Sequence, residues 1–209
     1  MTTTLSHQKQ AEALAIELAV AQLSTLADLP ARCALLGLPN PAATRGQVLI
    51  TVLGRPLALQ PPAFTARYAG SDRESKPAER LLALHYLACE TPVTPDERWL
   101  TFRDFPGGAF YWQPFCARSV QPLIQAIGND IARLQERLTR FAATIVDGPA
   151  DALTARVTAL GRIELQLVYR SGDEEFPPAA DVLFNACARR VCCAEDAAAL
   201  ASRLCLGLL

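Results

Sequence analysis

The spacing of apolar residues along the chain predicts helices separated by short strands and loops. Alanine and leucine recur near the helical period over residues 8–28, which predicts the first helix. Later helices are predicted over residues 77–89, 117–127, 130–145, 178–190 and 194–207. Pro77 and Pro178 support two of these starts, because proline is favoured in the first turn of a helix. Asp130 fits the N-cap of a third.

Strands are predicted where β-branched and apolar residues cluster or alternate with polar ones. Residues 47–53 and 56–59 form a predicted hairpin around Gly54, which can adopt the positive φ that a tight turn needs. The clearest strand covers residues 163–169, where apolar and polar residues alternate as in a half-buried strand. Two further strands are predicted over residues 64–68 and 98–103.

These elements predict the α+β class. Helices outnumber strands and do not alternate regularly with them, which argues against a parallel α/β sheet. We expect one helix-rich domain over residues 1–209, with a small antiparallel or mixed sheet. Residues 1–7 are expected to be a mobile N-terminal tail, and residues 8–70 and 77–209 are possible sub-lobes.

Composition narrows the classes of protein. The chain is 51% hydrophobic and 20% charged, which excludes an intrinsically disordered protein. Its formal net charge of -1 disfavours a nucleic-acid partner. No window approaches about 20 consecutive apolar residues, so a membrane partner is not expected. The polar first ten residues predict a soluble cytoplasmic protein, in which the seven cysteines are free thiols.

The acidic loop, residues 171–178, is the first candidate site. Asp173, Glu174 and Glu175 stand in a row after a predicted strand, and Phe176 can anchor the loop in the core. Neighbouring carboxylates can attract a metal ion or a cationic ligand, or form a general acid/base pair. The alternative is structural, because acidic residues before a helix starting at Pro178 would favour the positive end of its dipole.

The aromatic segment, residues 99–115, is the second candidate site. Half of the aromatic residues of the chain lie there: Trp99, Phe102, Phe105, Phe110, Tyr111, Trp112 and Phe115. Around the turn at Gly107 and Gly108 these rings can form one wall of a pocket for a flat ligand. The alternative is that they fill the core beneath a loop.

Cysteine and histidine give weaker signals. His85 and Cys89 are four residues apart on a predicted helix, so they can form a dyad or contribute to a zinc site, but no third ligand is evident. We therefore assign no metal site. Four cysteines near the C-terminus are interpreted as buried structural thiols, with a redox thiol at Cys192 or Cys193 as the alternative: Cys187, Cys192, Cys193 and Cys205.

The stretch from Leu165 to Phe184 resembles the signature of an uncharacterised prokaryotic family, domain of unknown function 3786. Supporting segments lie at residues 53–55, 110–115 and 195–196, and the resemblance extends over about residues 10–208. It implies a bacterial or archaeal protein, often from anaerobes, in a family associated with metals or cofactors. Some relatives carry a cysteine-rich iron–sulfur segment that this chain lacks. The resemblance implies no activity.

These observations favour a soluble binding protein with a small-molecule or cofactor ligand of unknown identity. We expect the acidic loop and the aromatic segment to share one recess, lined by Tyr111, Trp112, Phe115, Asp173, Glu174, Glu175 and Phe176. The first alternative is an enzyme that uses Asp173, Glu174 and Glu175 as acid and base. The second is an accessory protein-interaction subunit with an exposed apolar patch. The oligomeric state is not predicted.

Overall fold

A single antiparallel sheet organises the protein. The computed structural model describes the backbone of residues 2–149 and 151–209, and the side chains from His7 onward except those of residues 8 and 150. Seven of the eight strands follow the order β3-β2-β1-β6-β7-β8-β4, and the eighth, β5, pairs with β6 beside that path. Their bounds are β1 Val48–Val52, β2 Arg55–Gln60, β3 Thr65–Tyr68, β4 Trp99–Leu100, β5 Thr144–Ile145, β6 Ala152–Leu160, β7 Ile163–Arg170 and β8 Ala179–Asn185.

The sheet consists of two halves that are joined over a short stretch. Strands β1, β2 and β3 form an antiparallel meander, and β6, β7, β8 and β4 form the other half. Strands β1 and β6 share one register pair, Val52 with Leu160. Beside it, Leu53 N donates to Ala159 O at 2.9 Å and Gly161 N donates to Thr51 O at 2.8 Å. The expected sub-lobe boundary between residues 70 and 77 stays a prediction.

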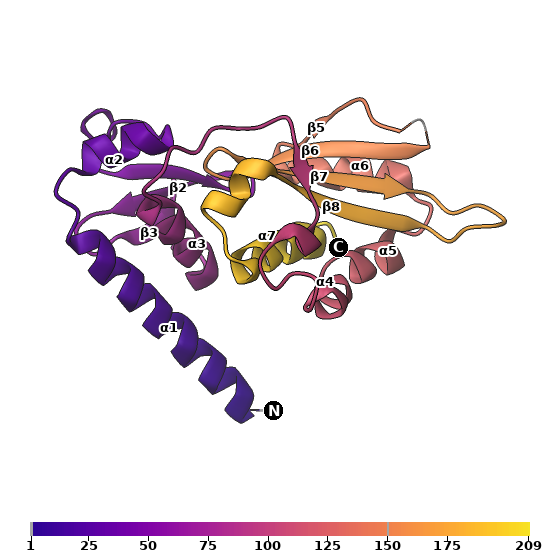
Figure 1. The fold of residues 1–209 in the computed structure, drawn as a ribbon, viewed down its shortest axis with the longest axis horizontal. Coiled ribbons are helices and arrows are strands. Elements are labelled where there is room, and N and C mark those ends of the chain that lie inside the picture. Colours follow the sequence, from indigo (N-terminus) through magenta and orange to yellow (C-terminus); the bar gives the residue numbers. More distant parts are fainter. Residues whose placement is uncertain (1, 150) are drawn as a thin grey trace.

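Helices pack mainly below the strands in the view of Figure 1. Helix α1 packs on α3, α3 contacts β1 and β6, and α5 contacts β8 and α7. The N-terminal part of α1 extends away from the body of the molecule (Figure 1). The helices are α1 Thr2–Ser24, α2 Leu29–Leu36, α3 Pro77–Ala88, α4 Trp112–Arg118, α5 Val120–Ile127, α6 Ile131–Leu138 and α7 Ala194–Gly207.

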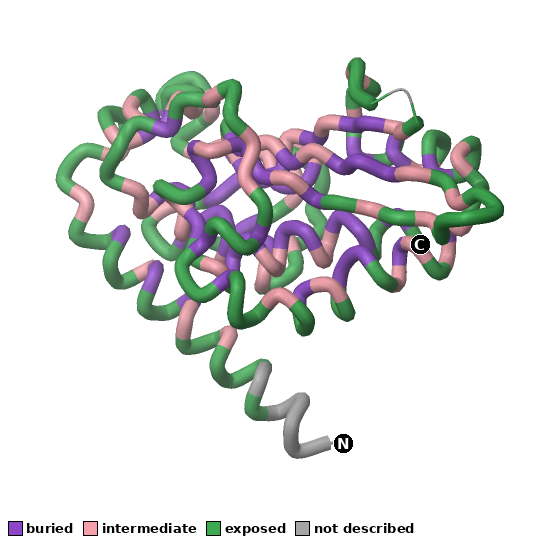
Figure 2. The backbone as a smooth tube through the Cα atoms, turned by 45° about the vertical axis from the view of Figure 1, so that its right-hand side comes forward, coloured by how far each residue is buried: buried purple, intermediate pink, exposed green. Residues whose placement is uncertain are grey.

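The core lies between the sheet and these helices, where Figure 2 shows the buried residues gathered. In β7, Ile163, Leu165 and Leu167 are buried while Glu164 and Gln166 remain partly exposed. This confirms the strand that the alternating pattern predicts. The α+β class is confirmed as well, but the sheet is larger than the small one that we expected.

The helix predicted over residues 178–190 is wrong. Residues Ala179–Asn185 form strand β8, and Ala186–Arg190 form a short 3-10 helix. Strand β8 pairs with β7 along its length, from the pair Arg170 and Ala179 at one end to the pair Leu165 and Phe184 at the other. Pairing along β7 satisfies the backbone of this segment, so tertiary contacts override its alanine-rich composition.

Other boundaries also differ. Strand β6 falls where no element was predicted. The helix expected over residues 130–145 ends at Leu138, because Ala142 takes a left-handed conformation with φ 49° before β5 begins. Helix α1 begins at Thr2 instead of residue 8 and ends at Ser24.

No single helix in the described part of the chain is long and apolar enough to cross a membrane. One pair of consecutive helices, Lys9–Ser24 and Leu29–Leu36, has the combined length and apolar composition of a membrane span, but the two helices meet at an angle of 111°.

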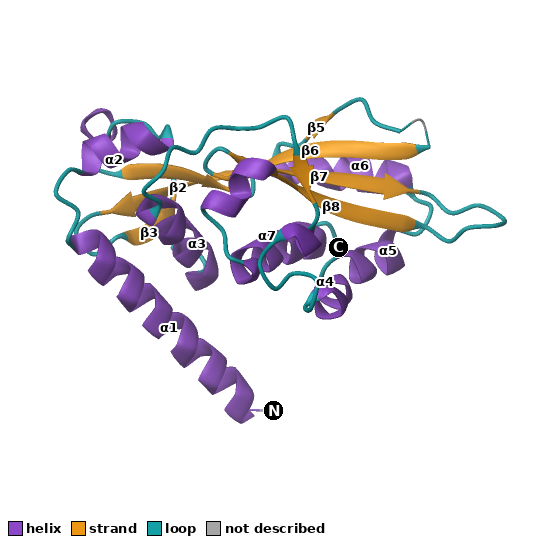
Figure 3. Cartoon of the chain, in the orientation of Figure 1, coloured by secondary structure: helices purple, strands orange, loops and turns teal. Residues whose placement is uncertain are grey.

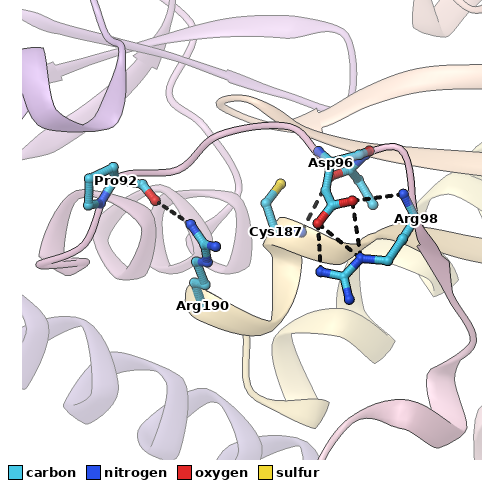
Figure 4. A network of polar contacts seen from close by, with 6 residues as sticks. Pro92, Asp96, Arg98, Cys187 and Arg190 are labelled. Carbon is cyan, nitrogen blue, oxygen red and sulfur yellow. Dashed lines mark hydrogen bonds and ion pairs between the residues drawn. The ribbon is translucent and has the colours of Figure 1, made fainter.

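The connection from α3 to β4 is a long loop (Figure 3) that one buried amide fastens to the sheet. Asn185, at the end of β8, is only 2% exposed. Its Nδ2 donates to Asp96 O at 2.5 Å, and its Oδ1 accepts from Asp96 N at 3.0 Å and Cys187 N at 3.3 Å. Around this amide, Arg98 pairs with Asp96 at 2.7 Å and Arg190 Nη1 donates to Pro92 O at 3.1 Å (Figure 4).

Candidate functional site

The acidic loop is a hydrogen-bonded turn at the tip of the β7–β8 hairpin (Figure 1). Asp173 Oδ1 accepts hydrogen bonds from Glu175 N and Phe176 N, both at 2.8 Å. Asp173 N donates in turn to Phe176 O at 2.9 Å. The two backbone donors hold the pKa of Asp173 below its usual range. One oxygen of Asp173 therefore already has a structural role in the turn.

The surroundings of the loop correct two expectations. Phe176 is 67% exposed, so it does not anchor the loop in the core. Strand β8, not a helix, follows Pro178, so the structural alternative based on a helix dipole is also wrong. An open cavity of about 410 Å³ lies here, lined by Gly128, Asn129 and residues 172–178. No residue of the aromatic segment lines this cavity.

Most rings of the aromatic segment belong to the core. Phe102 and Phe115 are buried and stack with their ring centres 4.1 Å apart. Phe105 is buried edge-to-face against Phe184 at 5.0 Å. Trp112 is partly buried and stacks on Phe115 at 5.5 Å. Core packing, the simpler alternative, thus describes these rings.

Phe110 and Tyr111 point outward instead. Phe110 is 83% exposed and Tyr111 is 55% exposed, and their rings meet edge-to-face at 5.1 Å. Backbone hydrogen bonds from both residues to Gly107 O hold them on a turn. The residues of the expected recess therefore differ in their surroundings. Tyr111 lies at the surface, Trp112 and Phe115 pack on the core, and residues 173–176 line a cavity that contains none of these three.

His85 pairs with a carboxylate, and the seven cysteines are free thiols. His85 Nδ1 lies 3.0 Å from both carboxylate oxygens of Asp196, and this hydrogen bond raises the pKa of the imidazole. Burial raises the pKa of Cys192, and partial desolvation raises the pKa of Cys193, which is exposed at the surface. The redox alternative predicts a lowered pKa instead. Among the described residues, no three His, Cys, Asp or Glu side chains gather to hold a metal ion.

A second surface feature, which we call the basic cleft, lies where the two halves of the sheet meet. It has a volume of about 460 Å³. The β1–β2 turn, the start of α3, the segment at Phe141 and the C-terminal half of α7 enclose it. Three cations, one carboxylate and several apolar side chains line it: Arg55, Lys76, Arg203, Glu79, Ser202, Val52, Leu53, Phe141, Ala199 and Leu206.

A strained turn positions the first cation. Leu53 and Gly54 both have positive φ values, 48° and 72°. Such a turn matches the twist of a hairpin but is unfavourable for leucine. A Cβ atom on residue 54 would lie 2.2 Å from Phe141 O, so glycine is required for close packing here. Arg55 follows directly as the first residue of β2.

Glu79 organises the floor of the basic cleft. Its Oε2 accepts a hydrogen bond from Tyr68 Oη at 2.6 Å and one from Lys76 N at 3.2 Å. Its Oε1 lies 3.9 Å from Arg203 Nη1, an ion pair without a hydrogen bond. Burial and then the hydrogen bond to Glu79 raise the pKa of Tyr68. Arg55 and Arg73 lie over the Tyr68 ring at 6.0 and 5.4 Å.

The basic cleft could not be recognised in the sequence, because its three cations lie far from one another along the chain. Arg55 follows a hairpin turn, Lys76 ends a loop and Arg203 lies on the last helix. The only available signal was the predicted turn at Gly54, which identifies a hairpin but not the residues that pack beside it.

The protein is thus an α+β protein with one antiparallel sheet and a basic cleft at the junction of the two sheet halves. Residues 28–206 match the family described as domain of unknown function (DUF3786), and the chain belongs to this family. No curated protein and no solved structure matches the chain. The prokaryotic origin and the association with metals or cofactors stay predictions.

Proposed function

We propose that this protein binds a small anionic molecule in the basic cleft. The observation that carries the proposal is the gathering of Arg55, Lys76 and Arg203 around one cavity in a chain whose formal net charge is -1. The volume of about 460 Å³ lies in the range typical of small-molecule sites. The proposal keeps the class of function that the sequence favours, a binding protein, but assigns the site to other residues.

The hydrogen-bonding capacity of these cations is free for a ligand. In the part of the chain that the structure describes, none of the three side chains donates a hydrogen bond, and their one ion pair is the 3.9 Å contact of Arg203 with Glu79. Three positive charges against one carboxylate give the cleft a net positive potential. Such a cleft attracts anions and orients a carboxylate or phosphate by charge-assisted hydrogen bonds.

Isothermal titration calorimetry with phenylpropionate and with inorganic phosphate tests the proposal. We expect Arg55→Gln, Lys76→Gln and Arg203→Gln each to weaken binding about tenfold, because a hydrogen bond to a charged group contributes about 1.5–3 kcal/mol. The matched control is Arg189→Gln, which removes an exposed cation outside the cleft and leaves binding unchanged. Affinity is expected to fall as ionic strength rises.

The proposal would be refuted if the wild-type protein bound neither probe. It would also be refuted if Arg189→Gln lowered the affinity as much as the three cleft variants do. The recess between the acidic loop and the aromatic segment stays a prediction, and the geometry gives it less support than the basic cleft. The enzyme alternative also stays a prediction, and it gains no support at Asp173, because the backbone donors of Phe176 and Glu175 lower the pKa of that carboxyl.

The exposed pair Phe110 and Tyr111 favours a second candidate function, an interaction subunit. A phenylalanine that is 83% exposed on a hydrogen-bonded turn is a typical anchor for a protein partner. If the partner is a second copy of the chain, sedimentation velocity should show a dimer. The variant Phe110→Ser should then be a monomer. A monomer at all concentrations in the wild-type protein would contradict self-association.

We also propose a cytoplasmic location. Its support is that all seven cysteines are free in the structure, as is usual in a reducing compartment. Microscopy or fractionation of cells that express the chain tests this, and recovery outside the cytoplasm would contradict it.

A further inference from the structure

Building on the proposed function, we infer that the ligand carries a hydrogen-bond donor, a hydroxyl or an amino group, next to its anionic group, and that Glu79 Oε1 accepts this donor. The ligand is then a carboxylate with a neighbouring hydroxyl or amino group and an apolar body. Glu79 is then the residue that determines specificity, and the cations supply general attraction.

The first support is the unequal use of the two oxygens of Glu79. The residue is only 8% exposed, yet it lines the cleft. Oε2 accepts two hydrogen bonds, from Tyr68 Oη and Lys76 N. Oε1 accepts none from the residues that the structure describes, since Arg203 Nη1 at 3.9 Å is too distant for a hydrogen bond.

Among the described residues, Oε1 is not one of the fully buried polar atoms that lack a hydrogen bond, so water reaches it in the free protein. A ligand that fills the cleft displaces this water, and a hydroxyl or ammonium group on the ligand then replaces the lost hydrogen bond. An anion without a donor leaves Oε1 with neither water nor a hydrogen bond. The cleft therefore discriminates between two anions of equal charge by the presence of the donor.

The second support is the division of the cleft lining into two kinds of surface. Arg55, Lys76 and Arg203 supply positive charge, whereas Leu53, Phe141 and Leu206 supply apolar contact. Leu206 is 47% exposed, so a ligand body can cover it. An anionic head beside a donor, on an apolar body, matches all three parts of this lining.

Three probes that differ at one position test the inference: phenylpropionate has no donor, phenyllactate has a hydroxyl group, and phenylalanine has an ammonium group. We expect the wild-type protein to bind phenyllactate, phenylalanine or both about tenfold more tightly than phenylpropionate, measured by calorimetry. Preference for phenylalanine identifies an amino acid ligand, and preference for phenyllactate identifies a hydroxy acid. Equal affinity for the three probes overturns the inference and leaves the proposed anion site intact.

Glu79→Gln supplies the second arm. Tyr68 Oη and Lys76 N both need an acceptor, so the amide oxygen is expected at the position of Oε2 and the amide NH₂ group at that of Oε1. The ammonium group of phenylalanine, which can only donate, then faces a donor, so its preference over phenylpropionate should disappear. The hydroxyl group of phenyllactate can also accept a hydrogen bond from the amide, so a preference for phenyllactate does not decide this arm of the test. A preference for phenylalanine that is retained in this variant overturns the inference. The comparison of probes on the wild-type protein decides it even where the variant does not fold. Absence of binding by all three probes and by phosphate refutes the proposed function itself.

Discussion

Asn185→Ala is expected to destabilise the protein strongly, because one buried amide fastens the loop between α3 and β4 to the sheet. The side chain is 2% exposed and makes three hydrogen bonds, two with the backbone of Asp96 and one with Cys187 N. Alanine removes all three bonds and leaves backbone groups without partners in a region that water reaches poorly.

The magnitude follows from the number of bonds. A hydrogen bond contributes about 1 kcal/mol net, so the loss of three lowers the free energy of unfolding by about 3 kcal/mol. For a chain of this length, that loss corresponds to a fall in Tm of roughly 6–12 °C. Asn185→Asp replaces the donor to Asp96 O by a carboxylate oxygen, so two acceptors face each other and a charge is buried, and this variant should be no more stable than the alanine variant.

Urea unfolding followed by circular dichroism measures the effect, with Asn129→Ala as the matched control. Asn129 also uses both ends of its amide, with Gly172 N at 2.8 Å and Gly172 O at 3.2 Å, but it is exposed. Water replaces its bonds, so the control should lose less than about 1 kcal/mol. A loss in Asn185→Ala no larger than in the control would refute the claim that burial makes this amide important.

Three further outcomes test other parts of the structure. Gly54→Ala should lower the free energy of unfolding by about 2 kcal/mol or more, measured in urea, because φ is positive and the new Cβ meets a carbonyl oxygen. The pKa of His85 is raised from 6.5 by Asp196, so this pair should stabilise the fold fully below about pH 6.5 and lose that effect as pH rises through the folded pKa. Unfolding of the wild type and His85→Gln across that range should therefore converge at high pH, and a constant difference would contradict the assignment. A thiol reagent should modify the exposed Cys193 before the buried thiols, and mass spectrometry identifies the site.

Local pattern was sufficient for some elements and insufficient for others, for identifiable reasons. Strand β7 alternates between an apolar and a polar face, so its burial is encoded in its own residues. Strand β8 begins with two alanines directly after Pro178, a start that favours a helix locally, and only pairing with β7 makes it a strand. The same dependence on a neighbour explains why β6 was missed.

The candidate sites differ in the same physical way. The acidic loop was recognisable from composition, but the sequence does not reveal that Asp173 Oδ1 is already engaged by two backbone donors. In the aromatic segment, exposure separates Phe110 from Phe102, and packing decides exposure. Composition therefore identifies segments that contain reactive or aromatic groups, while their availability depends on bonds formed in the folded state.

The location of the basic cleft suggests why the sheet has two halves. Arg55, Lys76 and Glu79 belong to the N-terminal half, with β2 and α3, whereas Arg203 lies on α7, which packs with α4 and α5 of the C-terminal half. Between strands β1 and β6 the register contains the single pair Val52 and Leu160. A ligand held by Arg55 and Arg203 together would therefore link the two halves beside the short stretch where β1 pairs with β6. Small-molecule sites are concave and bring together polar groups from different elements, and here groups from the two halves of the sheet converge above one continuous core.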